Sequence, residues 1–343
     1  MKLLDGLVLG IESSCDETSV AILDGFNVRA NIVASQIAMH QQWGGVVPEA
    51  AARAHVQSMI PCIASALQAA GASIADVRGI AVTNRPGLVG ALSVGVTAAK
   101  ALSVAQGVPL VGVHHLEGHL MSAHFAATRP EFPHVALIVS GGHTEIVLVR
   151  APGDYEIFGE TIDDAAGEAF DKCARLLGIP YPGGRGLQEL AATGNSRAFD
   201  LPRSLPKDPF NFSFSGLKTA ALRLIEREGP GINRHDAAAS IQAAIVDVLV
   251  KKVMHALREI GDVWGLTLVG GVAANSELRS RLADKCQQSG FGFATPPMEF
   301  CTDNAAMIAL AGSWRLAQGQ ADDSSLDVFP NAELPSSTHQ NQS

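Results

Sequence analysis

The chain has 343 residues, enough for about two domains, and an apolar content of 47% that can fill large cores. Its net charge of −9 excludes a general positive field for nucleic acid, so a polyanionic substrate would need a local basic patch or a basic partner. Asp5 and Glu12 interrupt the apolar run that a signal peptide would need, and glycines and charges break the apolar segment 88–113. We therefore expect a cytoplasmic protein with no membrane span, and its five cysteines, which form no C-x-x-C pair, indicate reduced thiols.

Two hairpins of the same design are predicted at residues 7–23 and 135–149. Each combines an apolar strand rich in β-branched residues, a turn of small or hydroxyl residues, and a second apolar strand. One such hairpin is common and would mean little, but two predict a duplicated fold. Backbone N–H groups and hydroxyls in these turns can face phosphate oxygens.

The segment HHLEGH at residues 114–119 is a candidate metal site. On an α-helix His115 and His119, four residues apart, share one face and can bind one cation. A third ligand must come from elsewhere, and Asp303, just ahead of the apolar run 305–311, would suit zinc or ferrous iron. A single histidine is more often an ordinary core or surface residue, so the pair needs support from other motifs.

The same segment also resembles a metalloprotease helix, in which a glutamate directly follows the first histidine. Here Glu117 lies two positions after His115, which rotates its carboxylate by roughly another 100° around the helix. This spacing disfavours protease chemistry.

Helical periodicity predicts a helix near residues 163–178, with Asp171 either facing a site or simply solvated. Ser215 is predicted to be the N-cap of a further helix. A long amphipathic helix is expected over about 236–260, with a core stripe of Ile241, Ile245, Val248, Leu249, Val253 and Leu257.

A glycine turn at Gly270 and Gly271 joins a predicted strand to a predicted helix starting at Ser276. Glycines there let a nucleotide approach the backbone. The turn lacks the signature residues of the Rossmann and P-loop motifs, so neither of these folds is indicated.

Taken in this order, the motifs resemble those of the tRNA adenosine threonylcarbamoyltransferase family, whose members were formerly named O-sialoglycoprotein endopeptidases. The resemblance runs from about Gly10 to Gly312. It rests on five segments that are specific in combination: GIESSCDET (10–18), GGVVPE (44–49), HHLEGH (114–119), VSGGHT (139–144) and FCTDN (300–304).

This resemblance implies an α/β protein with the two-lobed actin-like ATPase fold, in which duplicated mixed-sheet lobes surround a cleft. We expect residues 1–134 to form the first lobe, with 303–330 packing back on it. The second lobe would span 135–302 with a helical insert at about 160–230, and the polar end 331–343 would be a disordered tail.

The resemblance also implies site residues. His115, His119 and Asp303 would bind one Fe²⁺ or Zn²⁺ ion. The nucleotide-linked substrate would be contacted by Ile138, Val139, Ser140, Gly141, Gly142, Asp171, Gly184 and Asn275. Backbone amides at the glycines suit phosphate, and the Asp171 and Asn275 side chains suit hydroxyls or base edges.

The reaction implied is transfer of a threonylcarbamoyl group from its adenylate, threonylcarbamoyl-AMP, to N6 of adenosine 37 in tRNAs that read codons beginning with A. Glu12 or Asp16 could accept the amine proton. The expected partners are tRNA, a smaller paralogue of the same fold and a P-loop ATPase, with no membrane. A helix over about 50–72, with Val56 and Ile60 among its apolar residues, offers the paralogue a surface or packs only within its own lobe.

The chain departs from the family pattern at two positions. Arg85 stands where a Gly-Pro-Gly-Leu segment usually begins, and Gln188 stands where some relatives place an acidic contact to substrate hydroxyls. Two alternatives remain open. A kinase of the same fold would bind magnesium through carboxylates and would not need the histidine pair, and a non-catalytic scaffold paralogue would have lost the metal site.

Overall fold

The computed structural model of the chain describes residues 1–334 and divides into two compact units. Among the described residues, the first unit contains Met1–Phe125 and residues 303–334, and the second contains Ala126–Thr302. Most of the tail predicted at 331–343, from residue 335 on, lies outside the described residues.

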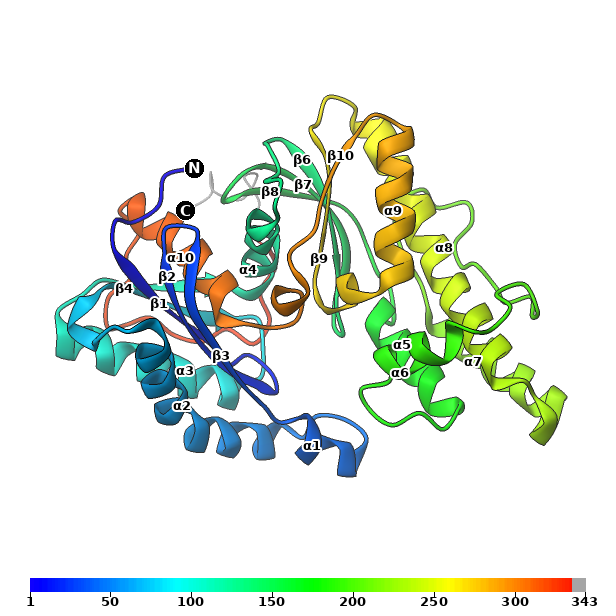
Figure 1. Cartoon of the computed structure of the whole chain (residues 1–343), viewed down its shortest axis with the longest axis horizontal. Helices are drawn as coiled ribbons and strands as arrows, with labels where there is room; N and C mark the ends of the chain where they lie inside the picture. Colours follow the sequence, from blue (N-terminus) through cyan, green and yellow to red (C-terminus); the bar gives the residue numbers. More distant parts are fainter. Residues whose placement is uncertain (335–343) are drawn as a thin grey trace. The chain divides into compact units, whose positions relative to one another are not determined.

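The first unit is built on a mixed sheet of five strands in the order β3-β2-β1-β4-β5. Strands β1 to β4 are labelled in Figure 1. The strands are β1 (Leu7–Glu12), β2 (Glu17–Asp24), β3 (Asn27–Ser35), β4 (Val77–Arg85) and β5 (Leu110–His114). β1, β2 and β3 pair antiparallel, whereas β4 and β5 continue the sheet in parallel from β1. The α-helices are α1 (Ile37–His40), α2 (Pro48–Ala70), α3 (Val89–Gln106), α4 (His115–Ser122) and α10 (Ala305–Ala317).

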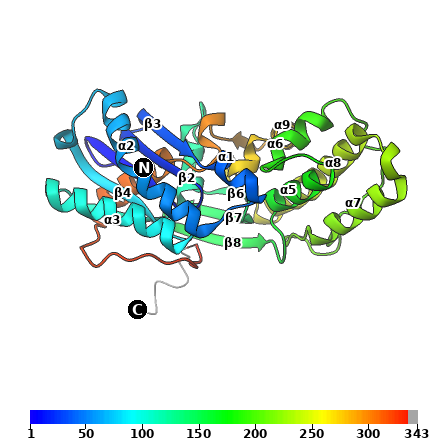
Figure 2. The ribbon, with the colours of Figure 1, turned by 90° about the horizontal axis from the view of Figure 1, so that it is seen from below.

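Alternation along β1 places helices on both faces of this sheet. Leu9 and Ile11 pack in the core beneath α2 and α3, which lie side by side (Figure 2). Val8 points to the opposite face, where it packs with α10. Helices on both faces explain why β1 is apolar along its length, as the first hairpin predicted, because side chains on either face are buried.

One described helix, α3, is long and apolar enough by composition alone to cross a membrane. Its residues Leu92, Val96 and Ala99 are buried, and the helix packs on β4 and α2. Apolar residues gathered on one face are those expected of a helix that covers a sheet.

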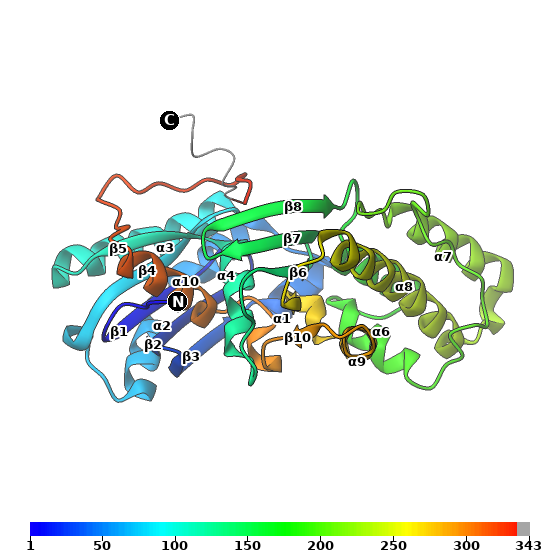
Figure 3. The ribbon, with the colours of Figure 1, turned by 90° about the horizontal axis from the view of Figure 1, so that it is seen from above.

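The second unit repeats the strand arrangement of the first, with the order β10-β9-β6-β7-β8. Its strands are β6 (His134–Val139), β7 (Thr144–Ala151), β8 (Asp154–Glu160), β9 (Gly265–Val269) and β10 (Gly292–Ala294). β6, β7 and β8 lie side by side and antiparallel (Figure 3), and β9 and β10 continue in parallel from β6. The predicted duplication is therefore confirmed strand by strand.

Helices of the second unit enclose its core on one face of the sheet. They are α5 (Ala166–Leu176), α6 (Gly183–Ala191), α7 (Ser215–Glu228), α8 (Arg234–Ile260) and α9 (Ser276–Gln288). The predicted stripe of α8 is confirmed, because all six of its residues belong to this core.

The prediction that Ser215 caps α7 is wrong. Phe214 occupies the N-cap position, and Ser215 is the first helical residue. The hydroxyl of Ser215 instead donates to Asp163 at 2.8 Å, and the same carboxylate accepts from the backbone N–H groups of Phe214 and Ser215. Asp163, which is distant in the sequence, thus accepts hydrogen bonds at the start of α7 in place of the predicted serine cap.

Candidate active site

In the first unit, glycines let α10 pack closely on β1 and α4. A Cβ added to Gly10 would lie 2.3 Å from the carbonyl oxygen of Ala305, and one added to Gly118 would lie 2.6 Å from Cδ1 of Ile308. Both distances are shorter than a van der Waals contact. At Gly10 the contact would be with backbone, so only glycine fits there, whereas at Gly118 the end of the Ile308 side chain would have to move. The close packing brings Asp303, two residues before α10, to the histidine face of α4.

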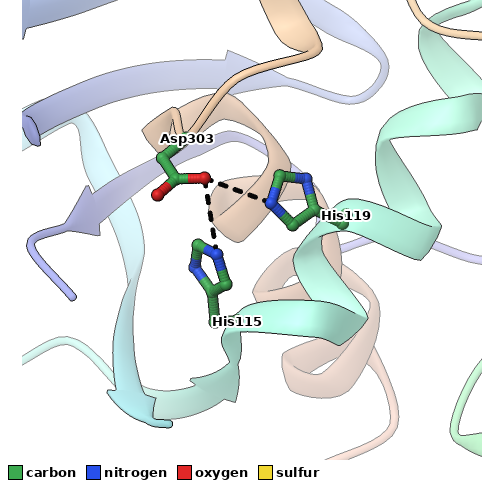
Figure 4. Close-up of side chains that lie close together, drawn as sticks. All are labelled: His115, His119 and Asp303. Atoms are coloured by element: carbon green, nitrogen blue, oxygen red, sulfur yellow. Dashed lines mark hydrogen bonds and ion pairs between the residues drawn. The ribbon is translucent and has the colours of Figure 1, made fainter. Parts of the chain in front are cut away.

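His115, His119 and Asp303 converge as the sequence predicted (Figure 4). The Nε2 atoms of His115 and His119 lie 3.4 and 3.2 Å from Oδ1 of Asp303. The two rings are edge to face, with centroids 4.7 Å apart. Both histidines are buried, and the Asp303 side chain is 26% exposed, so the cluster is open on the carboxylate side.

This cluster fits a first-row divalent metal ion. Zinc holds nitrogen and oxygen donors at about 2.0 to 2.2 Å in a tetrahedron, which separates the donors by roughly 3.3 to 3.5 Å. The two measured separations agree with that spacing. Two imidazoles and a carboxylate suit zinc or ferrous iron. Among residues 1–334, His115, His119 and Asp303 form a group whose ligand atoms lie close enough to one another to hold one ion.

Glu12 fixes the orientation of His115. Its Oε2 lies 2.9 Å from Nδ1 of His115 and accepts from the hydroxyl of Thr83 at 2.6 Å, while Oε1 accepts from the backbone N–H of Ser14. A carboxylate on the far nitrogen of a ligating histidine selects the tautomer that leaves Nε2 free for a metal. Glu12 is only 1% exposed, so this bond is held in the interior of the unit.

The charges of this cluster depend on one another. Burial alone lowers the pKa of His115, but the carboxylates of Asp303 and Glu12 outweigh burial and raise it well above its ordinary value. Burial raises the pKa of Asp303, yet His115 outweighs it and holds that pKa well below its ordinary value. For His119, burial dominates and lowers the pKa. The arrangement therefore stabilises negative oxygen donors beside the histidines.

Asp16, the other predicted proton acceptor, lies in the turn that follows β1, four residues after Glu12, and is partly buried. Burial, followed by the charge of Asp303, raises its pKa. Both proton-acceptor assignments stay predictions, and the hydrogen bonds of Glu12 favour a role in holding His115.

Glu117 points away from the histidine cluster. Its Oε2 accepts from Nε and Nη2 of Arg315 at 2.9 and 2.7 Å, and its side chain is fully buried. The pair ties α4 to the end of α10 and so supports the metal helix from its other side. This agrees with the sequence argument against a protease base.

The second unit contains a cavity of about 760 Å³, a size typical of small-molecule sites. Four of the predicted substrate residues line it: Gly141, Asp171, Gly184 and Asn275. The lining does not include the other four, Ile138, Val139, Ser140 and Gly142, which belong to the β6–β7 hairpin. The side chains of Ile138 and Val139 are fully buried, so only their backbone could meet a ligand.

Asp171 is neither a solvated helix residue nor a free carboxylate. Its Oδ1 accepts from the backbone N–H groups of Gly183 and Gly184 at 2.7 and 3.1 Å, at the first turn of α6. Burial raises the pKa of Asp171 despite these two bonds. Asp171 therefore anchors α6 while it lines the cavity.

Asn275 caps α9, because its Oδ1 accepts from the backbone N–H of Leu278 at 3.0 Å. Gln188 also binds the first turn of α9, since its Oε1 accepts from the N–H of Ser276 at 2.8 Å. Sequence reasoning missed several other lining residues, which belong to none of the five motif segments: Tyr181, Pro182, Arg185, Glu189 and Met298. Thr302 also lines the cavity and lies within the segment FCTDN, but sequence reasoning gave it no role.

Comparison with known proteins identifies the family. The family model for tRNA N6-adenosine threonylcarbamoyltransferase matches residues 27–310 of this chain. The chain belongs to that family. Among curated threonylcarbamoyltransferases, that of Variovorax paradoxus (strain S110) is 50% identical and covers 96% of this chain and 97% of its own length. That of Dehalococcoides mccartyi (strain BAV1) is 48% identical, with coverage of 96% and 99%.

Membership in the threonylcarbamoyltransferase family makes the protein a transferase that acts in tRNA modification. It favours this activity over the kinase and scaffold alternatives, and the three residues of the candidate metal cluster are all present.

Solved structures with little sequence similarity show the fold. Component A of the Acidaminococcus fermentans (R)-2-hydroxyglutaryl-CoA dehydratase is 18% identical, with a TM-score of 0.55 and coverage of 92% of this chain and all of that chain. Full-length HypF is 14% identical, with a TM-score of 0.61 and coverage of 95% of this chain and 48% of that chain. The threonylcarbamoyltransferase chain thus has the predicted actin-like ATPase fold.

Proposed function

We propose that the protein transfers the threonylcarbamoyl group from threonylcarbamoyl-AMP to N6 of adenosine 37 in tRNAs that read codons beginning with A, and that the transfer depends on one Fe²⁺ or Zn²⁺ ion. The observation that carries this proposal is the convergence of His115, His119 and Asp303 in a member of the threonylcarbamoyltransferase family.

The chemistry needs positioning more than it needs a protein nucleophile. The N6 amine attacks the carbamoyl carbon, a C–N bond forms, and the C–O bond to phosphate breaks as AMP leaves with the electron pair. The amine proton passes to a base, for which Glu12 and Asp16 are the candidates. Because the mixed anhydride is already activated, orientation and charge stabilisation suffice.

The cavity of the second unit supports adenylate binding. At Gly141 an added Cβ would meet nothing within 4 Å, so the backbone there is open to a ligand. Backbone N–H groups of the β6–β7 turn suit phosphate oxygens, and in our proposal Ile138, Val139, Ser140 and Gly142 act through this backbone. The polar side chains of Asp171 and Asn275 suit ribose hydroxyls or the base edge.

The three-residue metal cluster supports metal dependence. His115, His119 and Asp303 would hold the ion, with Glu12 fixing the ring of His115. When bound, the ion would supply Lewis-acid chemistry and a template for substrate oxygens.

Partners and location complete the proposal. A net charge of −9 supports the need for another protein in tRNA recognition, since it repels a polyanion at long range. On α2, Val56 and Ile60 are 64% and 67% exposed, which supports the docking of a smaller paralogue on this helix. The P-loop ATPase and the cytoplasmic location follow from the family resemblance.

Labelled substrate tests this proposal. The purified chain, with and without the two partner proteins, is incubated with tRNA and threonylcarbamoyl-AMP labelled in the threonine. We expect label in the tRNA and one AMP released per group transferred, with multiple turnovers only when the partners are present. A tRNA carrying guanosine in place of adenosine 37 is the matched control and should stay unlabelled. Equal labelling of both tRNAs would refute the assignment of the acceptor.

A further inference from the structure

The side-chain amide of Asn275 is held at both ends. Asn275 lines the cavity of the second unit and is 8% exposed. Its Oδ1 accepts from the N–H of Leu278 at 3.0 Å, and its Nδ2 donates to Oε1 of Gln242 at 2.9 Å. Gln242 lies on α8, is 6% exposed, and donates from Nε2 to Oε2 of Glu277 at 2.6 Å.

The direction of this chain of hydrogen bonds is unambiguous. A side-chain amide can in general be turned either way, with its oxygen and nitrogen exchanged. Here a backbone N–H, which only donates, faces the Asn275 amide at one end. A carboxylate of Glu277, which only accepts, faces Gln242 at the other end. Both amides are therefore fixed in a single orientation.

Ion pairs hold the far end of the chain in place. Oε1 of Glu277 lies 3.4 Å from Nη1 of Arg281, and Nη2 of Arg281 lies 2.7 Å from Oδ1 of Asp247. Asp247 is on α8, five residues after Gln242, and its Oδ2 also accepts from Arg203 at 2.7 Å. Rotation of the Gln242 amide would break its bond to Glu277 and leave a buried donor without an acceptor.

We infer that Gln242 is a positioning residue, which fixes the orientation in which Asn275 meets a nucleotide-linked ligand. An asparagine amide has two N–H groups and two oxygen lone pairs. Among the described residues, Gln242 accepts from one N–H of Asn275, and the N–H of Leu278 donates to one oxygen lone pair. Asn275 therefore offers the ligand one N–H and one lone pair in a fixed arrangement. This inference rests on the proposed adenylate site and assigns to it a residue that does not itself line the cavity.

A reciprocal exchange of side chains tests the inference. Gln242→Met keeps the length of the side chain and removes both hydrogen bonds. Gln242→Glu can still accept from Asn275, but it places a second carboxylate against Glu277. The double variant Gln242→Glu with Glu277→Gln restores both bonds. The glutamine at position 277 donates to the glutamate at position 242, and Asn275 also donates to that glutamate. Ser240→Ala is the matched control. Ser240 is a buried residue of the same helix, and its hydroxyl accepts from the N–H of Phe199 at 3.2 Å, a bond that alanine removes.

AMP is the probe, with its Kd measured by calorimetry and the melting temperature measured for each variant. Loss of one oriented hydrogen bond is expected to raise the Kd of each single Gln242 variant roughly tenfold. We expect the double variant to return within about threefold of the wild type, and Ser240→Ala to lower the melting temperature without changing the Kd.

Three other outcomes would contradict either the positioning role of Gln242 or the proposed adenylate site. Unchanged AMP affinity in Gln242→Met, or a double variant that binds no better than Gln242→Glu, overturns the positioning role. A loss of affinity in Ser240→Ala equal to that in Gln242→Met also overturns it, because general destabilisation would then explain both. If the wild type does not bind AMP, the proposed adenylate site fails and this inference fails with it.

Discussion

Replacing Glu12 by glutamine should weaken metal binding while leaving all three ligands in place. The glutamine keeps the shape of the side chain but loses the charge that lies 2.9 Å from Nδ1 of His115. Because Glu12 is 1% exposed, water cannot replace the lost interaction. Removing such a partner of a ligating histidine typically costs about 10- to 100-fold in metal affinity, or about 1.4 to 2.7 kcal/mol.

The assay is a titration of the metal-free protein with Zn²⁺ against a competing chelator. Asp16→Asn is the matched control, since it removes a carboxylate only four residues from Glu12, and the Asp16 carboxylate is not the one that holds His115. We expect the control to stay within about threefold of the wild type. The reasoning is refuted if Glu12→Gln binds Zn²⁺ as tightly as the wild type, or if Asp16→Asn weakens binding equally.

Three further variants test other parts of the structure. Asp163→Ala removes the acceptor of four hydrogen bonds at the start of α7, so urea unfolding should show a loss of about 1 to 2 kcal/mol, and an unchanged value would contradict this role. Burial, then Glu160, raises the pKa of Glu145 from 4.5 to about 7, so the native state keeps a proton that the unfolded state has lost. The unfolding free energy of the wild type should therefore fall between pH 4.5 and 7, and Glu145→Gln should reduce that fall by up to about 3 kcal/mol; parallel pH profiles would exclude the effect. Asp171→Ala removes the two bonds to the first turn of α6, so it should lower both the melting temperature and the AMP affinity.

Local patterns predicted the features that depend on local geometry. The i,i+4 spacing places His115 and His119 on one face of α4, and apolar runs on either side of a turn of small or hydroxyl residues predicted both hairpins. The position of Asp303 was predicted because an apolar run starts directly after it and because the family motif includes it.

Contacts between distant residues could not be predicted in the same way. Glu12 contacts His115, which lies 103 residues later in the chain, and Glu117 contacts Arg315, which lies 198 residues later. A hydrogen-bonding side chain carries no sign of its partner until the sheet and helices bring the two together. The error at Ser215 has the same cause, because a serine before a helix is a good local cap but a carboxylate 52 residues away can bind the same N–H groups.

Metal-dependent transfer to tRNA is the central claim, and product analysis of one protein in two states tests it most directly. The chain is stripped with a chelator, divided, and either left metal-free or reloaded with one equivalent of Fe²⁺ or Zn²⁺, then supplied with tRNA, threonylcarbamoyl-AMP and the partner proteins. Nucleosides from the digested tRNA are quantified by mass spectrometry. We predict threonylcarbamoyladenosine from the reloaded protein and none above background from the metal-free protein or from a reloaded His115→Ala, His119→Ala variant. Equal product from the metal-free and reloaded samples would contradict the account.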